Sequence, residues 1–160
     1  MNDYKKILER LRDMLNENGV EAAVVSPDDG KGAGSILFSR HRSFGSAANT
    51  ATGEFCFLSD EKSSYGVFSA RINVLSEIRE QSLPYLAVEI TNQNAQIPVG
   101  SFAWDPFANT VYFALKVPVT KALSEKELME EADSAVALSM SMAEHYCTDM
   151  LKLANAGGTI

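Results

Sequence analysis

The stretch that decides the fold runs over residues 82–128 and reads SLPYLAVEITNQNAQIPVGSFAWDPFANTVYFALKVPVTKALSEKEL. Its middle contains two runs of aromatic and β-branched residues, 99–105 and 110–117, separated by Pro106-Phe107-Ala108-Asn109. Aromatic and β-branched side chains favour strands, while Asp-Pro followed by Asn favours a turn. We therefore predict a hairpin here with a helix on either side, which is an order typical of an α+β domain.

Capping residues mark the two helices that flank this hairpin. The first helix is predicted over Leu83–Asn94, because Ser82 can serve as its N-cap. The second begins after Ser124, which can form a capping box with Glu127, and should continue as one helix to about Ala154. Its buried stripe is expected to contain Leu128, Ala132, Ala135, Ser139, Met142, Ala143, Tyr146 and Met150.

The first half reads as one helix followed by strands. An amphipathic helix is expected within residues 1–18, and Asn18-Gly19 should end it. Strands are then predicted at Val20–Val25, Ser35–Arg40, Glu54–Ser59 and Tyr65–Val74. In the last of these the even-numbered residues are predicted to face the core, so Arg71 should face solvent or a partner.

Two segments of the first half are expected to be loops. Residues 26–34 contain Gly30-Lys31-Gly32-Ala33-Gly34-Ser35, which is similar in composition to a phosphate-binding loop. The spacing is wrong for one, because these glycines precede a strand and no Lys-Ser/Thr pair opens a helix after them. Residues 43–53 are low in bulky side chains and rich in Ser, Ala, Asn, Thr and Gly, and we therefore predict a mobile loop there.

Length and charge indicate the class of protein. The 160 residues, 46% hydrophobic and 22% charged, fit a single domain over 1–160. The net charge of −7 opposes binding to nucleic acid or anionic lipid, and the small cluster Arg40-His41-Arg42 does not reverse it. No apolar run approaches the roughly 20 residues that span a bilayer. We predict a cytoplasmic protein that binds neither nucleic acid nor membrane.

The titratable side chains do not form a recognisable catalytic motif. Cys56 and Cys147 lack the spacing of a metal or redox site and are predicted to be buried thiols. His41 falls in a polar, loop-like region, and His145 points about 200° away from Cys147 on a helix. The acidic residues within 130–133 fit a solvated face near a helix N-terminus. We therefore expect no catalytic residue, no metal site, no cofactor and no enzymatic activity.

The hairpin contains the one concentration of aromatic residues, namely Phe102, Trp104, Phe107, Tyr112 and Phe113. In one interpretation Phe102 and Trp104 share a face and pack under a helix, while Tyr112 lies on the opposite face and Phe107 caps the turn. In the other, one face of the hairpin stays open as a protein-binding surface formed by these five residues.

The second half also resembles a known family. The resemblance rests on Ile90-Thr91-Asn92-Gln93-Asn94 at a helix end, Gly100-Ser101-Phe102 in a strand, the Asp105 turn, and Leu123-Ser124-Glu125-Lys126-Glu127-Leu128 opening the last helix. We interpret Asn92 and Asn94 as helix caps and turn formers, with ligand contact as the alternative. Over residues 65–158 this pattern is similar to the YbjN family, which shares a fold with the type III secretion chaperones.

The resemblance implies a twisted antiparallel sheet with an N-terminal, a middle and a long C-terminal helix packed on it. It also implies a chaperone-like or regulatory protein without enzymatic activity that is often dimeric. The leading hypothesis is a non-catalytic homodimeric domain whose partner is a protein client or itself. The alternative is a regulatory domain that responds to a small ligand in a pocket between the C-terminal helix and the sheet.

Overall fold

The computed structural model describes residues 3–27, 34–46, 48–59 and 62–155. These residues form one sheet, four α-helices and one short 3-10 helix, η1. In chain order the elements are α1 (Tyr4–Glu17), β1 (Glu21–Val25), β2 (Ile36–Arg42), β3 (Thr50–Ser59), β4 (Tyr65–Ser76), η1 (Glu80–Ser82), α2 (Leu83–Asn94), β5 (Ser101–Asp105), β6 (Thr110–Thr120), α3 (Glu125–Tyr146) and α4 (Thr148–Asn155). No helix in the described ranges is long and apolar enough to cross a membrane.

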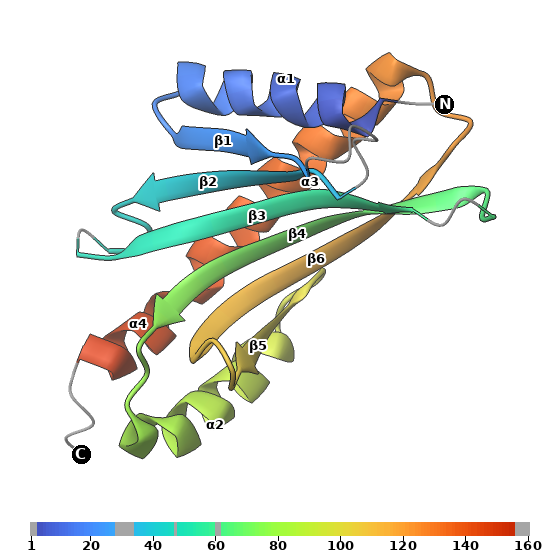
Figure 1. The fold of residues 1–160 in the computed structure, drawn as a ribbon. Helices are drawn as coiled ribbons and strands as arrows, with labels where there is room; N and C mark the ends of the chain where they lie inside the picture. Colours follow the sequence, from blue (N-terminus) through green and yellow to red (C-terminus); the bar gives the residue numbers. More distant parts are fainter. Residues whose placement is uncertain (1–2, 28–33, 47, 60–61, 156–160) are drawn as a thin grey trace.

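The sheet is antiparallel throughout and has the strand order β1-β2-β3-β4-β6-β5. The first four strands follow one another as neighbours, and the β5–β6 hairpin then joins with β6 against β4. Figure 1 shows a strongly twisted sheet whose long strands β3, β4 and β6 lie at the centre. The predicted α+β fold with a twisted antiparallel sheet is confirmed.

The helices leave one face of the sheet uncovered. α1 packs on β1 and β2, α3 crosses behind β4 and β6, and α2 lies beside β5 in contact with α4 (Figure 1). Within the described chain, no helix packs on the opposite side, which we call the open face. Strand residues alternate between the helix side and the open face, as the burial pattern of β4 shows.

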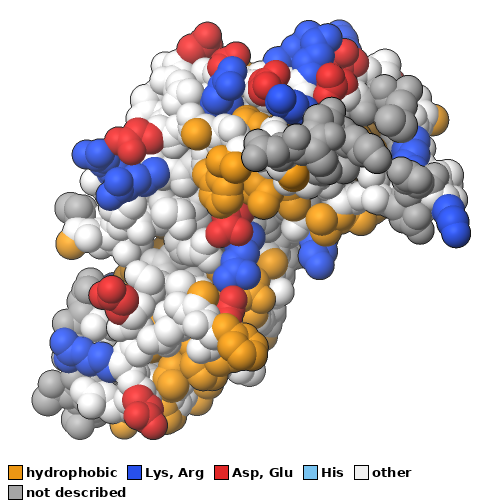
Figure 2. All heavy atoms as spheres, viewed as in Figure 1, with side chains coloured by type: hydrophobic (Ala, Val, Ile, Leu, Met, Phe, Trp, Pro, Cys, Tyr) orange, Lys and Arg blue, Asp and Glu red, His pale blue; other side chains and the backbone are white. Residues whose placement is uncertain are grey.

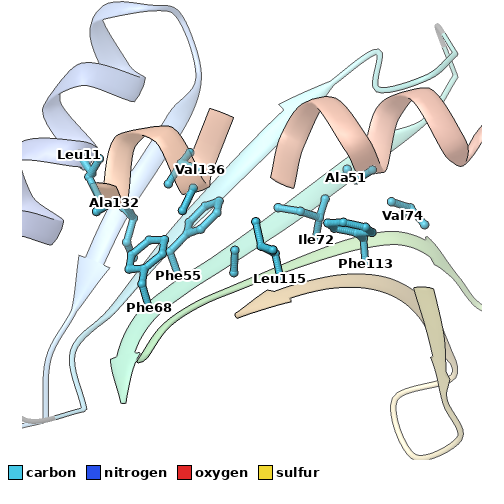
Figure 3. Close-up of a cluster of buried hydrophobic side chains, with 14 of the residues drawn as sticks. Leu11, Ala51, Phe55, Phe68, Ile72, Val74, Phe113, Leu115, Ala132 and Val136 are labelled. Carbon is cyan, nitrogen blue, oxygen red and sulfur yellow. The ribbon is translucent and has the colours of Figure 1, made fainter. Parts of the chain in front are cut away.

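The core lies between the helix side of the sheet and α3. Phe55, Phe68 and Phe113 are at most 1% exposed; Phe55 and Phe68 lie toward Ala132 and Val136 on α3, and Phe113 lies farther along the sheet beside Ile72 and Val74 (Figure 3). Small residues on the helix allow its backbone to approach the aromatic layer closely, which gives the dense packing that stabilises a core. The predicted core face of β4, its even-numbered residues, is confirmed.

The predicted start of the last helix is confirmed. The Glu127 amide donates to Ser124 Oγ at 3.3 Å, and the Ser124 amide donates to the Glu127 carboxylate at 2.8 Å. Hydrogen bonds from the Ser124 side chain and then its backbone lower the pKa of Glu127. The prediction of one uninterrupted helix is wrong, because the chain bends at Cys147 and continues as α4. The bend brings α4 against α2 and buries Met150.

Two predicted boundaries differ in the sheet. β6 continues through Pro118 to Thr120, whereas we expected the chain to leave the sheet at Pro118. The proline is tolerated because β5 pairs with β6 only as far as Ser101–Ala114, so β6 has one neighbour beyond that point. The predicted loop 43–53 is also too long, since β3 begins at Thr50. Ala51 and Gly53 are buried at the start of this strand, and a Cβ at Gly53 would collide with the Ser39 side chain.

Ser82 is not the N-cap that the sequence suggested. Its backbone is already helical because η1 leads directly into α2, and its side chain makes no capping hydrogen bond. An N-cap requires a non-helical backbone conformation, usually an extended one. The predicted range of α2, Leu83–Asn94, is nevertheless confirmed.

Candidate interaction surface

The five aromatic residues of the β5–β6 hairpin lie in different environments. Phe102 and Phe113 are buried, with their rings in edge-to-face contact at a centroid distance of 5.3 Å. Trp104 faces the helix side near α2, Tyr112 lies on the open face, and Phe107 is fully exposed in the turn. Phe102 packs as the first interpretation expected, whereas Trp104 is 41% exposed and only partly covered by α2. Phe102 and Phe113 belong to the core, so they offer no surface to a partner.

The open face has an apolar half built from alternate residues of four strands. Its members are Val25, Ile36, Phe38, Cys56, Leu58 and Val67. Val25 is 57% exposed, Phe38 38% and Leu58 50%. Figure 2 shows hydrophobic side chains gathered on this face, interrupted by a short row of acidic and basic side chains. Contiguous exposed apolar side chains on a soluble domain usually mark a surface that binds another molecule.

The charged row is a network centred on Arg71. Arg71 Nη2 donates to Asp105 at 3.0 Å, Arg71 Nε donates to Asn73 at 3.0 Å, and the guanidinium lies 3.9 Å from the centre of the Tyr112 ring. Asn73 Nδ2 in turn donates to the Glu54 carboxylate at 3.1 Å. The network joins side chains of four strands and holds the Arg71 side chain in one position. A binding partner would therefore meet a positive charge that is already fixed. The prediction that Arg71 faces outward is confirmed.

Asp105 connects this network to the hairpin turn. Its Oδ1 accepts the backbone N–H groups of Phe107 and Ala108 at 3.0 and 3.1 Å, while its Oδ2 accepts from Arg71. The hydrogen bond from Ala108, followed by the one from the Arg71 side chain, lowers the pKa of Asp105. Asp105 is therefore ionised at neutral pH and fixes both the turn and the orientation of the guanidinium.

The two outermost strands, β1 and β5, are each bonded at one residue by an asparagine from the preceding helix. Asn94 accepts the Phe102 N–H at 2.7 Å and donates to the Phe102 carbonyl at 2.9 Å. Asn16 makes the same pair of bonds with Ala22 on β1, at 2.9 and 3.2 Å. We call these pairs the asparagine clamps. In an edge strand, only alternate residues point their backbone N–H and C=O groups away from the sheet. One clamp therefore bonds a large share of the unpaired backbone groups of a five-residue edge strand.

The clamps are the feature that sequence reasoning missed. Asn94 was interpreted as a cap or turn former, whereas its side chain crosses to the edge strand. A signal was present twice in the sequence, since each asparagine lies in the last two residues of a helix and a glycine, Gly19 or Gly100, stands a few residues later, shortly before the edge strand. Gly19 and Gly100 both have φ near +79°, a conformation that glycine adopts without strain.

One serine–histidine pair has the geometry of a nucleophile and base but not the access. His41 lies in β2 and not in the predicted polar loop, and its Nε2 is 2.6 Å from Ser39 Oγ. Ser39 is 4% and His41 9% exposed on the helix side of the sheet. Burial lowers the pKa of His41, with the Glu144 charge opposing the shift. A substrate could not reach the serine without unfolding the helix layer, so the pair is structural.

The other titratable candidates are placed as follows. His145, Glu130, Glu131 and Asp133 are exposed on α3. Cys147 is buried, and burial raises the pKa of its thiol to about 12. Cys56 is half-buried on the open face, so the predicted buried thiol is confirmed only for Cys147. Among the described residues, no group of three His, Cys, Asp or Glu side chains is arranged to hold a metal ion.

Side chains of α3 and of the sheet pack together where the ligand pocket was predicted, and neither of the two hollows described below lies between them. Leu128, Ala143 and Phe113 are all completely buried in this layer. A cavity of about 610 Å³ lies instead beside the start of α1 and the ends of β3 and β4. Its lining includes Tyr4 and Phe57, whose rings stack with centroids 4.4 Å apart. A smaller apolar hollow of about 200 Å³ separates α2 from Trp104.

Comparison with known proteins gives a likeness of fold. No protein-family model matches this chain, and no curated protein matches it. Among solved structures, the crystal structure of YbjN from E. coli, a protein suggested to be a transcription regulator, covers 91% of this chain and 91% of its own. The two are 14% identical in sequence, with a TM-score of 0.49.

Proposed function

We propose that this chain is a non-catalytic, cytoplasmic protein-binding domain, chaperone-like or regulatory in role, that works as a homodimer. The observation that carries the proposal is the apolar half of the open face, where Val25, Phe38 and Leu58 are exposed on an ordered sheet. Large apolar side chains that are exposed together on rigid strands are unfavourable in water. A protein partner that covers them removes this unfavourable contact, which makes binding favourable.

The asparagine clamps support a face-on mode of binding. An extended peptide that adds to a sheet needs a row of unpaired backbone groups at an edge strand. At Ala22 and Phe102 those groups are already bonded to Asn16 and Asn94. A partner therefore gains more from side-chain contacts on the open face than from backbone pairing at either edge.

Affinity capture with open-face variants tests this proposal. The tagged protein would be used to capture partners from native cells, and the captured proteins would be identified by mass spectrometry. We expect Phe38→Lys combined with Leu58→Lys to lose the captured partners, because two charges would be buried in an apolar contact. Val88→Lys is the matched control, since Val88 is 61% exposed on α2. Equal capture by wild type and the double variant would reject the open face as the binding surface.

A second candidate, a regulatory domain that responds to a small ligand, is favoured by the 610 Å³ cavity beside α1. That volume falls within the range of small-molecule sites, roughly 300–1,000 Å³. A thermal-shift screen separates the two candidates. Strong stabilisation by one metabolite, abolished by Phe57→Trp in the cavity wall, would favour the ligand, while an unchanged melting temperature throughout favours a protein partner.

A further inference from the structure

We propose that the open face pairs with the open face of a second copy of this chain, about a two-fold axis that runs parallel to the strands between β3 and β4. This inference rests on the proposed function and deepens it, because it names the surface through which the homodimer forms. The occupant of the open face is then the open face of an identical chain, with β1 to β3 of one copy lying over β4 to β6 of the other.

The register of β3 and β4 is self-complementary about this axis. On the open face the cross-strand partners are Thr52 and Asn73, Glu54 and Arg71, Cys56 and Ser69, and Leu58 and Val67. A two-fold axis between the strands exchanges the members of each pair. Glu54 of one copy then faces Arg71 of the second copy, and the same contact occurs again on the other side of the axis. Two oppositely charged contacts form at the centre of the interface.

The neighbouring strands give compatible contacts as well. β2 of one copy lies over β6 of the other, because each is the outer neighbour of β3 or β4. The row through Glu54 and Arg71 continues to Phe38 and Ala114, so a large ring meets a small side chain. The next row brings Arg40 over the Tyr112 ring of the second copy, which is a cation–π arrangement.

Other two-fold axes in the plane of the sheet fit poorly. An axis perpendicular to the strands along the row of Glu54 would place Glu54 over Glu54 and Arg71 over Arg71, and like charges at an interface cost several kcal/mol. An axis between β2 and β3 would place Phe38 over Glu54 and bury a carboxylate against a ring. Of these three axes, only the one between β3 and β4 pairs Glu54 with Arg71, and it also places Leu58 over Val67 of the second copy.

Arg71 is arranged to make the contact without breaking its own network. The hydrogen bonds of its guanidinium within the chain use Nε toward Asn73 and Nη2 toward Asp105. Nη1 is the atom that would donate to Glu54 of the second copy. Among the residues that the structure describes, the Glu54 carboxylate accepts one side-chain hydrogen bond, from the Asn73 amide. The carboxylate has further lone pairs, so it can accept from Arg71 of the second copy while it keeps that bond.

The charge on the open face also suits self-association. The chain as a whole carries −7, so two copies repel each other. The open face differs from the chain as a whole, because positively and negatively charged side chains are nearly equal in number there. The cations are Arg40, Arg42, Arg71 and Lys116, and the anions are Glu21, Glu54 and Asp105. The acidic excess lies elsewhere on the molecule, and the repulsion at the contact is small.

A charge-swap experiment tests this pairing. We expect the wild type to sediment as a dimer, and Glu54→Arg or Arg71→Glu alone to raise the dimer dissociation constant by at least about 100-fold, because each creates two like-charge contacts. An equimolar mixture of the two variants should form a heterodimer, since every contact then joins opposite charges. Val88→Lys is the control and should leave the dimer unchanged.

A second pair of variants covers the case in which Arg71→Glu does not fold next to Asp105. Leu58→Asp and Val67→Lys should each dissociate the dimer and should form a heterodimer when mixed. A wild-type dimer that no open-face variant weakens would overturn this interface, while the proposed homodimer would stand. A wild type that stays monomeric at high micromolar concentration would also overturn it, and the capture experiment would then decide separately whether the open face binds another protein.

Discussion

Replacing Asn94 with alanine would remove the two hydrogen bonds of the clamp on β5 and no other contact of comparable energy. Both bonds join the Asn94 side chain to the backbone of Phe102, at 2.7 and 2.9 Å, and the site is partly buried. The Phe102 side chain is itself 2% exposed and packs on Phe113. The clamp thus connects the end of α2 to a strand that carries core residues.

Each such hydrogen bond contributes about 0.5–1.5 kcal/mol to stability, so the loss of two costs about 1–3 kcal/mol. Alanine is a better helix former than asparagine by up to ~0.7 kcal/mol, which partly offsets the loss. Asn92→Ala measures that offset alone, because Asn92 is exposed on the same helix and its side chain has no hydrogen bond among the described residues. The difference between the two variants therefore isolates the clamp.

Urea unfolding followed by circular dichroism measures both variants. We expect Asn94→Ala to be less stable than Asn92→Ala by about 1–3 kcal/mol, which corresponds to a melting temperature lower by roughly 3–10 °C for a chain of this length. Asn94→Asp should be as unstable as the alanine variant, because a carboxylate would face the Phe102 carbonyl. Equal stability of Asn94→Ala and Asn92→Ala would refute the clamp as a stabilising contact.

Three further predictions follow from the buried and capped residues. Burial lowers the pKa of His41 below its ordinary value of 6.5, so the unfolded chain binds a proton at this histidine more readily than the folded chain does. The stability of the fold should therefore fall as the pH decreases below about 6.5, and His41→Gln should flatten this part of a pH–stability curve. An unaltered slope in that variant would contradict the assignment. Ser124→Ala should cost about 0.5–2 kcal/mol in urea unfolding, and Ser134→Ala, an exposed control on the same helix, should change stability by less than about 0.5 kcal/mol. Since burial raises the pKa of Cys147 to about 12, a thiol reagent at neutral pH should modify Cys56 well before Cys147, and peptide mapping that finds equal rates would count against the packing of α4.

Local patterns in the sequence were sufficient to predict most of the elements. The alternation in β4 identified its core face, the capping box at Ser124 identified the start of α3, and the Asp105–Asn109 turn identified the hairpin. Each of these signals acts within a few residues of chain. The wrong boundaries occurred where an element far away in the sequence determines the end of a helix or strand. Pro118 stays in β6 because β5 is short, and the long helix is interrupted at Cys147 where α4 turns toward α2.

The candidate site was predicted less well because it depends on contacts between strands. The aromatic residues drew attention to the hairpin, but Phe102 and Phe113 are core residues, and the apolar half of the open face comes from β1 to β4. Arg71 was correctly placed on an outward face, whereas its partner Asp105 lies on a different strand. Pairings of this kind require the strand order, which local periodicity does not contain.

By itself, the sequence determined the class of fold, the identity of the helices and the inward face of the central strand, since propensity, capping and alternation act on neighbouring residues. Only the tertiary structure decided that all the helices cover one side of the sheet, that Asn16 and Asn94 each bond one residue of its two outermost strands, and that Glu54 lies beside Arg71 on the uncovered face. These features arise from the packing of segments far apart in the chain, and such contacts are fixed only when the whole sheet is assembled.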